Sequence, residues 1–330
     1  MGDTGKDGNP RQASRALIAQ SIALAQQGSF EEARERLNQL ASDQTMLDHS
    51  GLGPHTALGL PRKLHAAYLK LAKLEKDRSK IIALQYSLVP PPSILLPFSR
   101  FDSGERRAMA ALNRLPVPRV LHQIWLGDLA LPLATSAWAD HCARHGLTYR
   151  LWREADLRIE GLDQHPSFQD MLARGDYPGA VDVARYLILE RFGGIYLDCD
   201  WYPARDDISF ADCLPLTGLT ALAEDTPRQL GLGSLLLTNS LLASPPAHPV
   251  FTRIIKAMPQ AMAALPDAPA WWSTGPVLLT VVFRGTSFNV PDAQFVAANL
   301  PRQAPFSAVE AARETAQQED GGLLIGWKSW

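Results

Sequence analysis

Apolar residues recur at helical spacing along the first part of the chain. Between residues 16 and 24 they fall close to three or four positions apart, which predicts a helix that ends at Gly28 in a left-handed cap. A second helix follows, and a third is predicted over roughly residues 61–87, where leucines, alanines and a tyrosine share one face. We therefore expect a hairpin-like, all-α region over residues 15–89.

The segments on either side of this helical region have a different composition. Residues 1–14 are rich in Gly, Asp, Asn and Gln, so we expect this N-terminus to be disordered. Three consecutive prolines begin at Pro90, and further prolines follow up to Pro118. Because proline fixes φ and removes a backbone donor, we expect a Pro-rich connector over residues 90–117.

After Pro118 short apolar runs alternate with segments of helical pattern. Strands that alternate with helices indicate βαβ units and a mainly parallel sheet. The runs predicted as strands are 119–126, 147–152 and 195–201, and the predicted helices between them are 133–145 and 179–192. We expect an α/β domain over residues 118–330, and functional residues within it.

Composition narrows the class of protein. Of the 330 residues 46% are hydrophobic and 20% charged, which provides a sizeable core and excludes a wholly disordered chain. The formal net charge of −2 excludes nucleic-acid binding by bulk charge. No apolar stretch approaches the ~20 residues of a membrane-spanning helix, and the polar start lacks a signal-peptide core. With only three scattered cysteines, we expect a cytoplasmic protein.

One segment is strongly basic despite the balanced total. Residues 62–80 carry seven lysines and arginines but only two acidic residues, Glu75 and Asp77. A solvated helix face is the plainest interpretation of such a run. The alternative is a surface that contacts an anionic membrane or a polyanionic acceptor, which would place the protein at the inner face of the membrane.

The strongest chemical signal is a pair of aspartates at the end of the predicted strand 195–201. Side chains alternate along a strand, so Tyr196, Asp198 and Asp200 are predicted to point to one side. In open α/β sheets ligands bind at the carboxyl ends of the strands. Two carboxylates suit Mn²⁺ or Mg²⁺, whose other positions go to water and substrate phosphates. The plainer alternative is a pair of acids in a surface turn.

The helix before this strand carries a second charged pair. Asp182 and Arg185 are three positions apart and therefore share one helix face. A carboxylate and a guanidinium together suit a polyhydroxylated ligand. The alternative is an ion pair on the helix surface, which contributes little to stability.

Four blocks in this order resemble the sugar-binding DXD glycosyltransferases. The blocks are Leu121-His-Gln-Ile-Trp125-Leu-Gly127, Tyr149-Arg-Leu-Trp152, Ala180-x-Asp182-x-x-Arg185-Tyr186 and Gly193-Gly-Ile-Tyr196-Leu-Asp198-x-Asp200. The chain is most similar to glycosyltransferase family 32, which includes capsular-polysaccharide transferases and yeast initiating mannosyltransferases. The glucosylating clostridial toxins are more distant relatives. The resemblance covers residues 118–330 and is dense over 118–202.

The resemblance implies a GT-A type fold, with a Rossmann-like mixed sheet flanked by helices, and a role for each matched residue. Asp182 and Arg185 would grip the donor sugar as catalytic residues. Asp198 and Asp200 would hold the metal–diphosphate. The residues implied to bind the donor are Trp125, Tyr196, Asn239, Ser329 and Trp330.

One feature of the family pattern is missing near the C-terminus. The family usually has a histidine shortly before its Ser-Trp pair, whereas this chain has Leu324, Ile325 and Gly326 in that region. One metal or phosphate contact of the family is therefore absent, and the Asp pair is unaffected.

By resemblance, the chain is a metal-dependent hexosyltransferase that retains the anomeric configuration. The donor is expected to be a nucleotide-diphospho-sugar, with UDP favoured over GDP. The acceptor would be a glycan, a lipid-linked sugar or a protein, and surface polysaccharide synthesis is one setting. Two alternatives stay open. One is a toxin-like transferase that modifies a protein, and the other is a catalytically degenerate scaffold with a helical interaction region.

Overall fold

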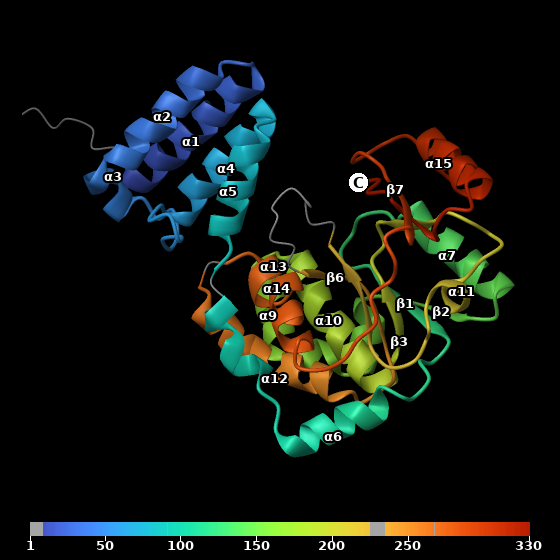
Figure 1. The fold of residues 1–330 in the computed structure, drawn as a ribbon. Coiled ribbons are helices and arrows are strands. Elements are labelled where there is room, and N and C mark those ends of the chain that lie inside the picture. The colour runs from blue at the N-terminus through green and yellow to red at the C-terminus, as the bar shows by residue number, and fades with distance from the viewer. Residues whose placement is uncertain (1–8, 91, 225–234, 267) are drawn as a thin grey trace, which may run out of the picture. The chain divides into compact units, whose positions relative to one another are not determined.

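A computed structural model describes residues 9–90, 92–224, 235–266 and 268–330. The chain divides into two compact units, one up to Pro91 and one from Pro92 onward. In the described part, no helix combines the length and the apolar character that crossing a membrane requires. Figure 1 shows the helices of the first unit in blue to cyan and the mixed sheet of the second in green to orange.

The first unit consists of helices. Their bounds are α1 Pro10–Gln26, α2 Phe30–Ser42, α3 Gln44–His49, α4 Arg62–Glu75 and α5 Arg78–Leu88. Apolar side chains that include Leu37, Leu40 and Leu64 form the core of the unit. The all-α character expected here is therefore present. Of the N-terminus expected to be disordered, residues 1–8 lie outside the described residues, and residues 10–14 belong to α1.

The prediction of one long helix over 61–87 is wrong. Lys76 adopts a left-handed conformation with φ 58°, which ends α4. The carboxylate of Asp77 accepts a hydrogen bond from the backbone N–H of Lys80 (3.1 Å) and caps α5. The apolar spacing is that of a helix on both sides, but this local cap divides the segment into two helices.

The segment expected as a connector contains regular structure. Two 3₁₀ turns, η1 Pro92–Ile94 and η2 Leu96–Ser99, precede helix α6, Ser103–Leu112. Asp102 and Glu105 form a reciprocal capping box at the start of α6. This capping signal outweighs the prolines nearby, which all lie outside α6.

The centre of the second unit is a five-stranded mixed sheet with the order β2-β1-β3-β6-β5. The strands are β1 Val120–Ile124, β2 Thr148–Trp152, β3 Gly194–Leu197, β5 Thr220–Ala223 and β6 Leu237–Ser244. Strands β2, β1 and β3 are parallel, whereas β6 runs antiparallel to both β3 and β5. The predicted α/β class, a mixed sheet flanked by helices, is confirmed.

A second, three-stranded sheet has the order β4-β8-β7. It consists of β4 Trp201–Pro203, β7 Val296–Asn299 and β8 Leu324–Gly326. The predicted strand 195–201 is therefore wrong, because β3 and β4 belong to different sheets and residues 198–200 form the link between them. Since β8 pairs with β4, the C-terminal segment lies beside the Asp pair.

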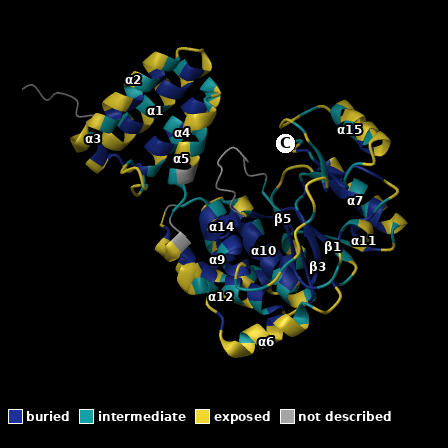
Figure 2. Ribbon diagram, viewed as in Figure 1, coloured by how far each residue is buried: buried dark blue, intermediate teal, exposed yellow. Residues whose placement is uncertain are grey.

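Helices flank the central sheet. They are α7 Leu133–Arg144, α8 Glu154–Ile159, η3 Leu162–Gln164, α9 Pro166–Ala173, α10 Tyr177–Phe192, α11 Phe210–Cys213, α12 Pro249–Ala264, α13 Ala270–Ser273, α14 Pro276–Phe283 and α15 Phe306–Gln318. Helices α10 and α14 contact β6, whereas α7 packs on β2 and β4. Figure 2 shows α10 and α14 as largely buried and α6 as largely exposed.

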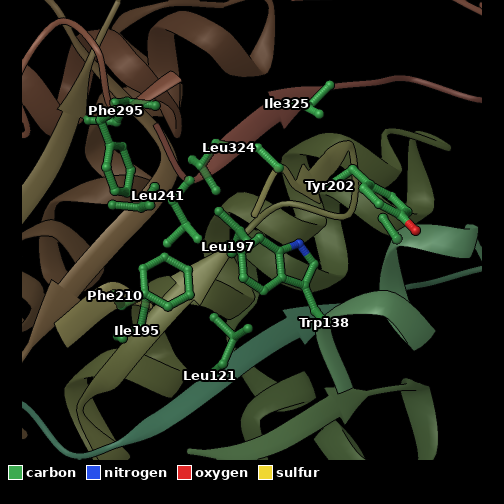
Figure 3. Packing of buried hydrophobic residues seen from close by; sticks show 14 of the residues in the cluster. Leu121, Trp138, Ile195, Leu197, Tyr202, Phe210, Leu241, Phe295, Leu324 and Ile325 are labelled. Carbon is green, nitrogen blue, oxygen red and sulfur yellow. The ribbon is translucent and has the colours of Figure 1, made fainter. Parts of the chain in front are cut away.

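An apolar core joins the two sheets, as Figure 3 shows. The indole of Trp138 on α7 stacks on Phe210 with ring centroids 5.2 Å apart. Its Nε1 donates a hydrogen bond to the backbone oxygen of Trp201 (2.8 Å), so it has a partner although it is fully buried. Since Trp201 directly follows Asp200, the core fixes the chain at the point where the Asp pair emerges.

Candidate active site

Helix α10 delivers Asp182 and Arg185 into the interior. Both residues are nearly inaccessible, at 6% and 4% exposure, and Arg185 Nη2 lies 3.0 Å from Asp182 Oδ1. The alternative of a surface ion pair is therefore wrong. The reason is that α10 has no polar face: its apolar residues are distributed almost all around the helix, which indicates a helix covered on every side.

The guanidinium of Arg185 joins several parts of the site. Its Nη1 donates to the backbone oxygen of Asn239 (2.6 Å) and lies 3.2 Å from Asp198 Oδ1. The carbon at its centre lies 4.6 Å from the ring centroid of Tyr196. Arg185 therefore links α10, β3, β6 and the Asp pair, and its charge is already shared between two carboxylates.

Asp182 has protein partners on both carboxylate oxygens. Oδ1 accepts from Nδ2 of Asn239 (2.7 Å), and Oδ2 accepts from Oγ1 of Thr274 (3.1 Å). Burial raises the pKa of Asp182 to about 6, against the opposing effect of Arg185. A β-carbon on Gly275 would come within 3.0 Å of Oδ2, so the chain passes close to this carboxylate.

The Asp pair lies in the link between the two sheets. Asp198 Oδ1 accepts from the hydroxyl of Tyr196 (2.6 Å), and its backbone N–H donates to the oxygen of Ser240 (2.8 Å). The backbone oxygen of Asp200 accepts from the N–H of Trp327 (2.7 Å). Burial, followed by the charge of Asp198, raises the pKa of Asp200 to about 6, whereas the charge of Lys328 lowers it.

A smaller cavity of about 340 Å³ opens on one side of the Asp pair. Trp125, which follows β1, and Trp330 at the C-terminus contribute aromatic walls, with ring centroids 4.8 Å apart and nearly perpendicular planes. Tyr177 and Val181 of α10 line it as well. The structure thus places the predicted donor residues Trp125 and Trp330 together.

A larger cavity of about 1070 Å³ opens on the other side. Its walls come from the ends of β5 and β6, from α13 and from all three strands of the small sheet. Asp182 and Asn239 line this cavity. The two cavities share five lining residues, which are Pro178, Arg185, Asp198, Asp200 and Lys328.

Two predicted donor residues lie elsewhere. Tyr196 is 1% exposed, lines neither of these cavities, and directs its hydroxyl to Asp198. Ser329 lines neither cavity, although its neighbours Lys328 and Trp330 do. In this structure Tyr196 thus orients Asp198, a candidate metal ligand, from outside the lining of both cavities.

Sequence reasoning missed Lys328. Its side chain lines both cavities, and its ammonium lies 5.4 Å from the ring centroid of Trp330. The only signal in the sequence was its place within the C-terminal Trp-Lys-Ser-Trp segment. Pairing of β8 with β4 is what brings this segment to Asp200.

The carboxylate oxygens of Asp198 and Asp200 are ligands that suit Mn²⁺ or Mg²⁺. Among the described residues, no cluster of three or more His, Cys, Asp or Glu side chains could hold a metal ion. Leu324 and Ile325, which lie in the region where the resemblance implies a histidine, are both fully buried in β8. Two carboxylates at a wall shared by two cavities leave the remaining positions to water and phosphate oxygens, as Mg²⁺ prefers.

Comparison with known proteins points to glycosyl transfer. The profile of the TcdA/TcdB catalytic glycosyltransferase domain matches residues 149–211, the stretch that holds α10 and the Asp pair. A mannosyl phosphorylinositol ceramide synthase of Saccharomyces cerevisiae is 27% identical over 173 residues, 51% of this chain and 43% of that protein. Inositol phosphoceramide mannosyltransferase 3 of Schizosaccharomyces pombe is 24% identical over 54% of this chain and 48% of that protein.

Among solved structures, the chain is similar to PaToxG glycosyltransferase, with a TM-score of 0.41 and 16% identity over 58% of this chain and 77% of that chain. The chain spans less than half the length of the two yeast relatives. The profile match and the names of the relatives show that it carries a glycosyltransferase domain.

Proposed function

We propose that the protein is a metal-dependent, retaining hexosyltransferase of the GT-A type, related to glycosyltransferase family 32. The observation that carries this proposal is the position of Asp198 and Asp200 at the wall shared by the two cavities. A diphosphate held there has its nucleoside on one side and its sugar on the other. The yeast relatives are named as mannosyl-transferring enzymes, so mannose is the first hexose to test.

The smaller cavity is assigned to the nucleoside. Its volume of about 340 Å³ lies within the range of ligand sites, and Trp125 and Trp330 offer flat apolar surfaces for a base. Trp125 is held by a hydrogen bond from its Nε1 to the backbone oxygen of Leu129 (2.9 Å).

Asp198 and Asp200 would hold the metal, which supplies Lewis-acid neutralisation of the diphosphate leaving group when it is bound. Arg185 and Tyr196 orient Asp198 through the contacts described above. Lys328 adds a positive charge on the same wall, where negative charge develops as the sugar leaves.

The donor sugar is assigned to the side of the shared wall that faces Asp182 and Asn239. Nδ2 of Asn239 is occupied by Asp182 and by the hydroxyl of Tyr186 (3.1 Å), which leaves Oδ1 to accept from a sugar hydroxyl. Asp182 is a poor enzymatic nucleophile, because both of its oxygens accept protein hydrogen bonds. Retention by front-face displacement, with the leaving phosphate taking the acceptor proton, fits this arrangement.

Donor turnover by the purified chain tests the proposal. We expect hydrolysis or transfer from a UDP- or GDP-hexose that depends on Mn²⁺ or Mg²⁺. Asp198→Ala and Asp200→Ala should each lower kcat/KM for the donor by about a thousandfold, because loss of metal–phosphate stabilisation costs several kcal/mol. Glu310→Ala on α15, an exposed carboxylate outside both cavities, is the matched control. Full activity of either aspartate variant would disprove the assignment.

A second candidate function is modification of a protein by a toxin-like transferase. The match to the TcdA/TcdB catalytic domain over residues 149–211 favours it. Incubation of a cell lysate with labelled donor distinguishes transfer to a protein from transfer to a glycan or a lipid-linked sugar. Labelled protein bands would support the toxin-like function. The scaffold alternative predicts no donor binding at all, which calorimetry with UDP- and GDP-sugars and Mn²⁺ measures directly.

We also retain peripheral membrane contact at the inner membrane face as a proposal. Lys63, Lys70 and Lys73 of α4 are exposed, whereas Lys80 pairs with Asp77 (3.0 Å). An exposed cluster of lysines suits an anionic bilayer at low ionic strength.

A further inference from the structure

We propose that the larger cavity is the acceptor site and that it takes the end of a neutral, polyhydroxylated saccharide. The inference rests on the proposed function, because it assigns the second substrate of the same site. Three properties of the cavity carry it: its position, its aromatic and neutral polar lining, and its charge.

The larger cavity lies directly beside the Asp pair. Among the described residues, the larger cavity shares with the smaller one the lining residues Pro178, Arg185, Asp198, Asp200 and Lys328. A sugar carried on a diphosphate at this wall therefore meets its acceptor in the larger cavity. At about 1070 Å³ the space slightly exceeds the usual range for ligand sites, about 300–1,000 Å³. It has room for a donor sugar and an acceptor of more than one ring.

The lining offers the groups that bind sugars. Trp201 of β4 and Trp271 of α13 both line the cavity and remain partly exposed, and aromatic side chains are suited to pack on the C–H groups of a sugar. Neutral polar groups stand beside them, among them Ser240 and the exposed Asn299 of β7. Hydroxyl and amide groups can donate to and accept from the hydroxyls of a saccharide.

The charge of the lining disfavours an anionic acceptor. Asp182, Asp198, Asp200, Glu224 and Asp292 line the cavity, and Asp292 is exposed. Of the described cationic side chains in this lining, Arg185 is already shared between Asp182 and Asp198, and the other is Lys328. A divalent cation and the donor diphosphate offset one another, so they do not reverse this balance. A phosphate-bearing headgroup would meet like charge, which costs affinity and selects against such acceptors.

A panel of acceptors tests this assignment with the wild-type protein and the donor that it hydrolyses. The panel contains neutral oligosaccharides, phosphatidylinositol vesicles and a cell lysate. We expect kcat/KM for the best neutral oligosaccharide to exceed that for phosphatidylinositol by at least about tenfold. An equal or higher value for the anionic lipid, transfer confined to protein bands, or no labelled saccharide at millimolar acceptor would each overturn the inference. If no donor is turned over at all, the proposed function itself fails.

Paired variants locate the acceptor in the molecule. Trp271 lines only the larger cavity and Tyr177 only the smaller one. Trp271→Ala should raise the acceptor KM about tenfold and the donor KM by less, because the loss of a stacked ring weakens binding of the sugar that packs on it. Tyr177→Ala should instead raise the donor KM. A Trp271→Ala variant that weakens the donor and spares the acceptor would contradict the inference.

A charge reversal tests the electrostatic part separately. Asp292→Lys should raise the ratio of kcat/KM for an anionic acceptor to kcat/KM for a neutral one about tenfold. The reason is that a lysine in the lining of the larger cavity attracts an anionic acceptor, whereas the aspartate repels it. Asp292→Asn should produce a smaller change in the same direction, because it removes the negative charge without reversing it. If this ratio of kcat/KM values is unchanged in both Asp292 variants, the charge of the cavity does not select against anionic acceptors.

Discussion

At the scale of single residues, burial decides which charges are available to a ligand. Arg185 and Asp182 are nearly inaccessible and bonded to each other, to Asn239 and to Asp198. The hydroxyl of Tyr196 likewise serves Asp198. These groups orient the site, because a buried ionised group must be paired to be tolerated. Lys328, by contrast, is exposed at the wall shared by both cavities.

The accessible position of Lys328 leads to a prediction. Lys328→Met should lower kcat/KM for the donor by about ten- to a hundredfold, because one charge-assisted contact to a phosphate is worth about 1.5–3 kcal/mol. Lys328→Arg should keep most of the activity, since the positive charge remains.

Steady-state donor hydrolysis at fixed Mn²⁺ measures this effect. A Lys328→Met enzyme with wild-type kcat/KM would show that the ammonium does not contact the diphosphate. Circular dichroism of the variant controls for loss of fold.

At the scale of elements, a glycine turn joins the helix that carries Asp182 to the strand that leads to Asp198. Gly193 ends α10 with φ 61° and ψ −156°, a conformation that favours glycine. A β-carbon at this position would come within 2.7 Å of the backbone nitrogen of Pro246. Both the conformation and the space around it therefore require glycine.

Gly193→Ala should destabilise the second unit by about 2–4 kcal/mol, as the strained φ adds to a backbone clash. Gly146→Ala is the matched control: its φ is 63°, and no heavy atom lies within 4 Å of the added β-carbon. That variant should lose only about 1 kcal/mol.

Urea unfolding followed by tryptophan fluorescence compares the two variants. All eight tryptophans lie at or after Trp125, so the signal reports the second unit alone. Equal losses for Gly193→Ala and Gly146→Ala would show that the close contact with Pro246 carries no energy.

At the scale of the whole molecule, the second unit holds three buried histidines with depressed pKa values. Burial lowers the pKa of His122, His141 and His248 to about 4 from the usual 6.5. Both ring nitrogens of His141 lack a partner in the described part of the chain. Between pH 6.5 and 4 the unfolded chain binds more protons at these sites than the folded one. The free energy of unfolding therefore decreases as the pH is lowered through this range.

Buried carboxylates act in the opposite sense over the same range. Asp182 and Asp200 have pKa values raised to about 6, so the folded state binds protons there first. Three histidines outweigh two carboxylates, and the net loss from pH 7 to pH 5 should be about 3 kcal/mol.

Unfolding curves at pH 7 and pH 5, recorded by tryptophan fluorescence in EDTA, test this prediction. His141→Phe keeps an aromatic ring beside Trp138 and should remove about 2 kcal/mol of the difference. A pH-independent stability between these values would contradict the assignment of these histidines as neutral.

The sequence by itself determined the elements and the chemistry that local patterns encode. Periodicity predicted the α/β class, and the order of four blocks predicted a glycosyltransferase domain. It failed where a local cap competes with periodicity, as at Lys76 and Asp77, and where a strand divides between two sheets after Leu197.

The tertiary structure decided which of these residues face a ligand. Pairing of β8 with β4 brings Lys328 to Asp200, more than a hundred positions away along the chain. Tyr196 is buried on β3 between β1 and β6, and Trp271 of α13 lines the larger cavity. No periodic signal records such contacts, because they depend on which elements pair in space and on how deeply each side chain is then buried.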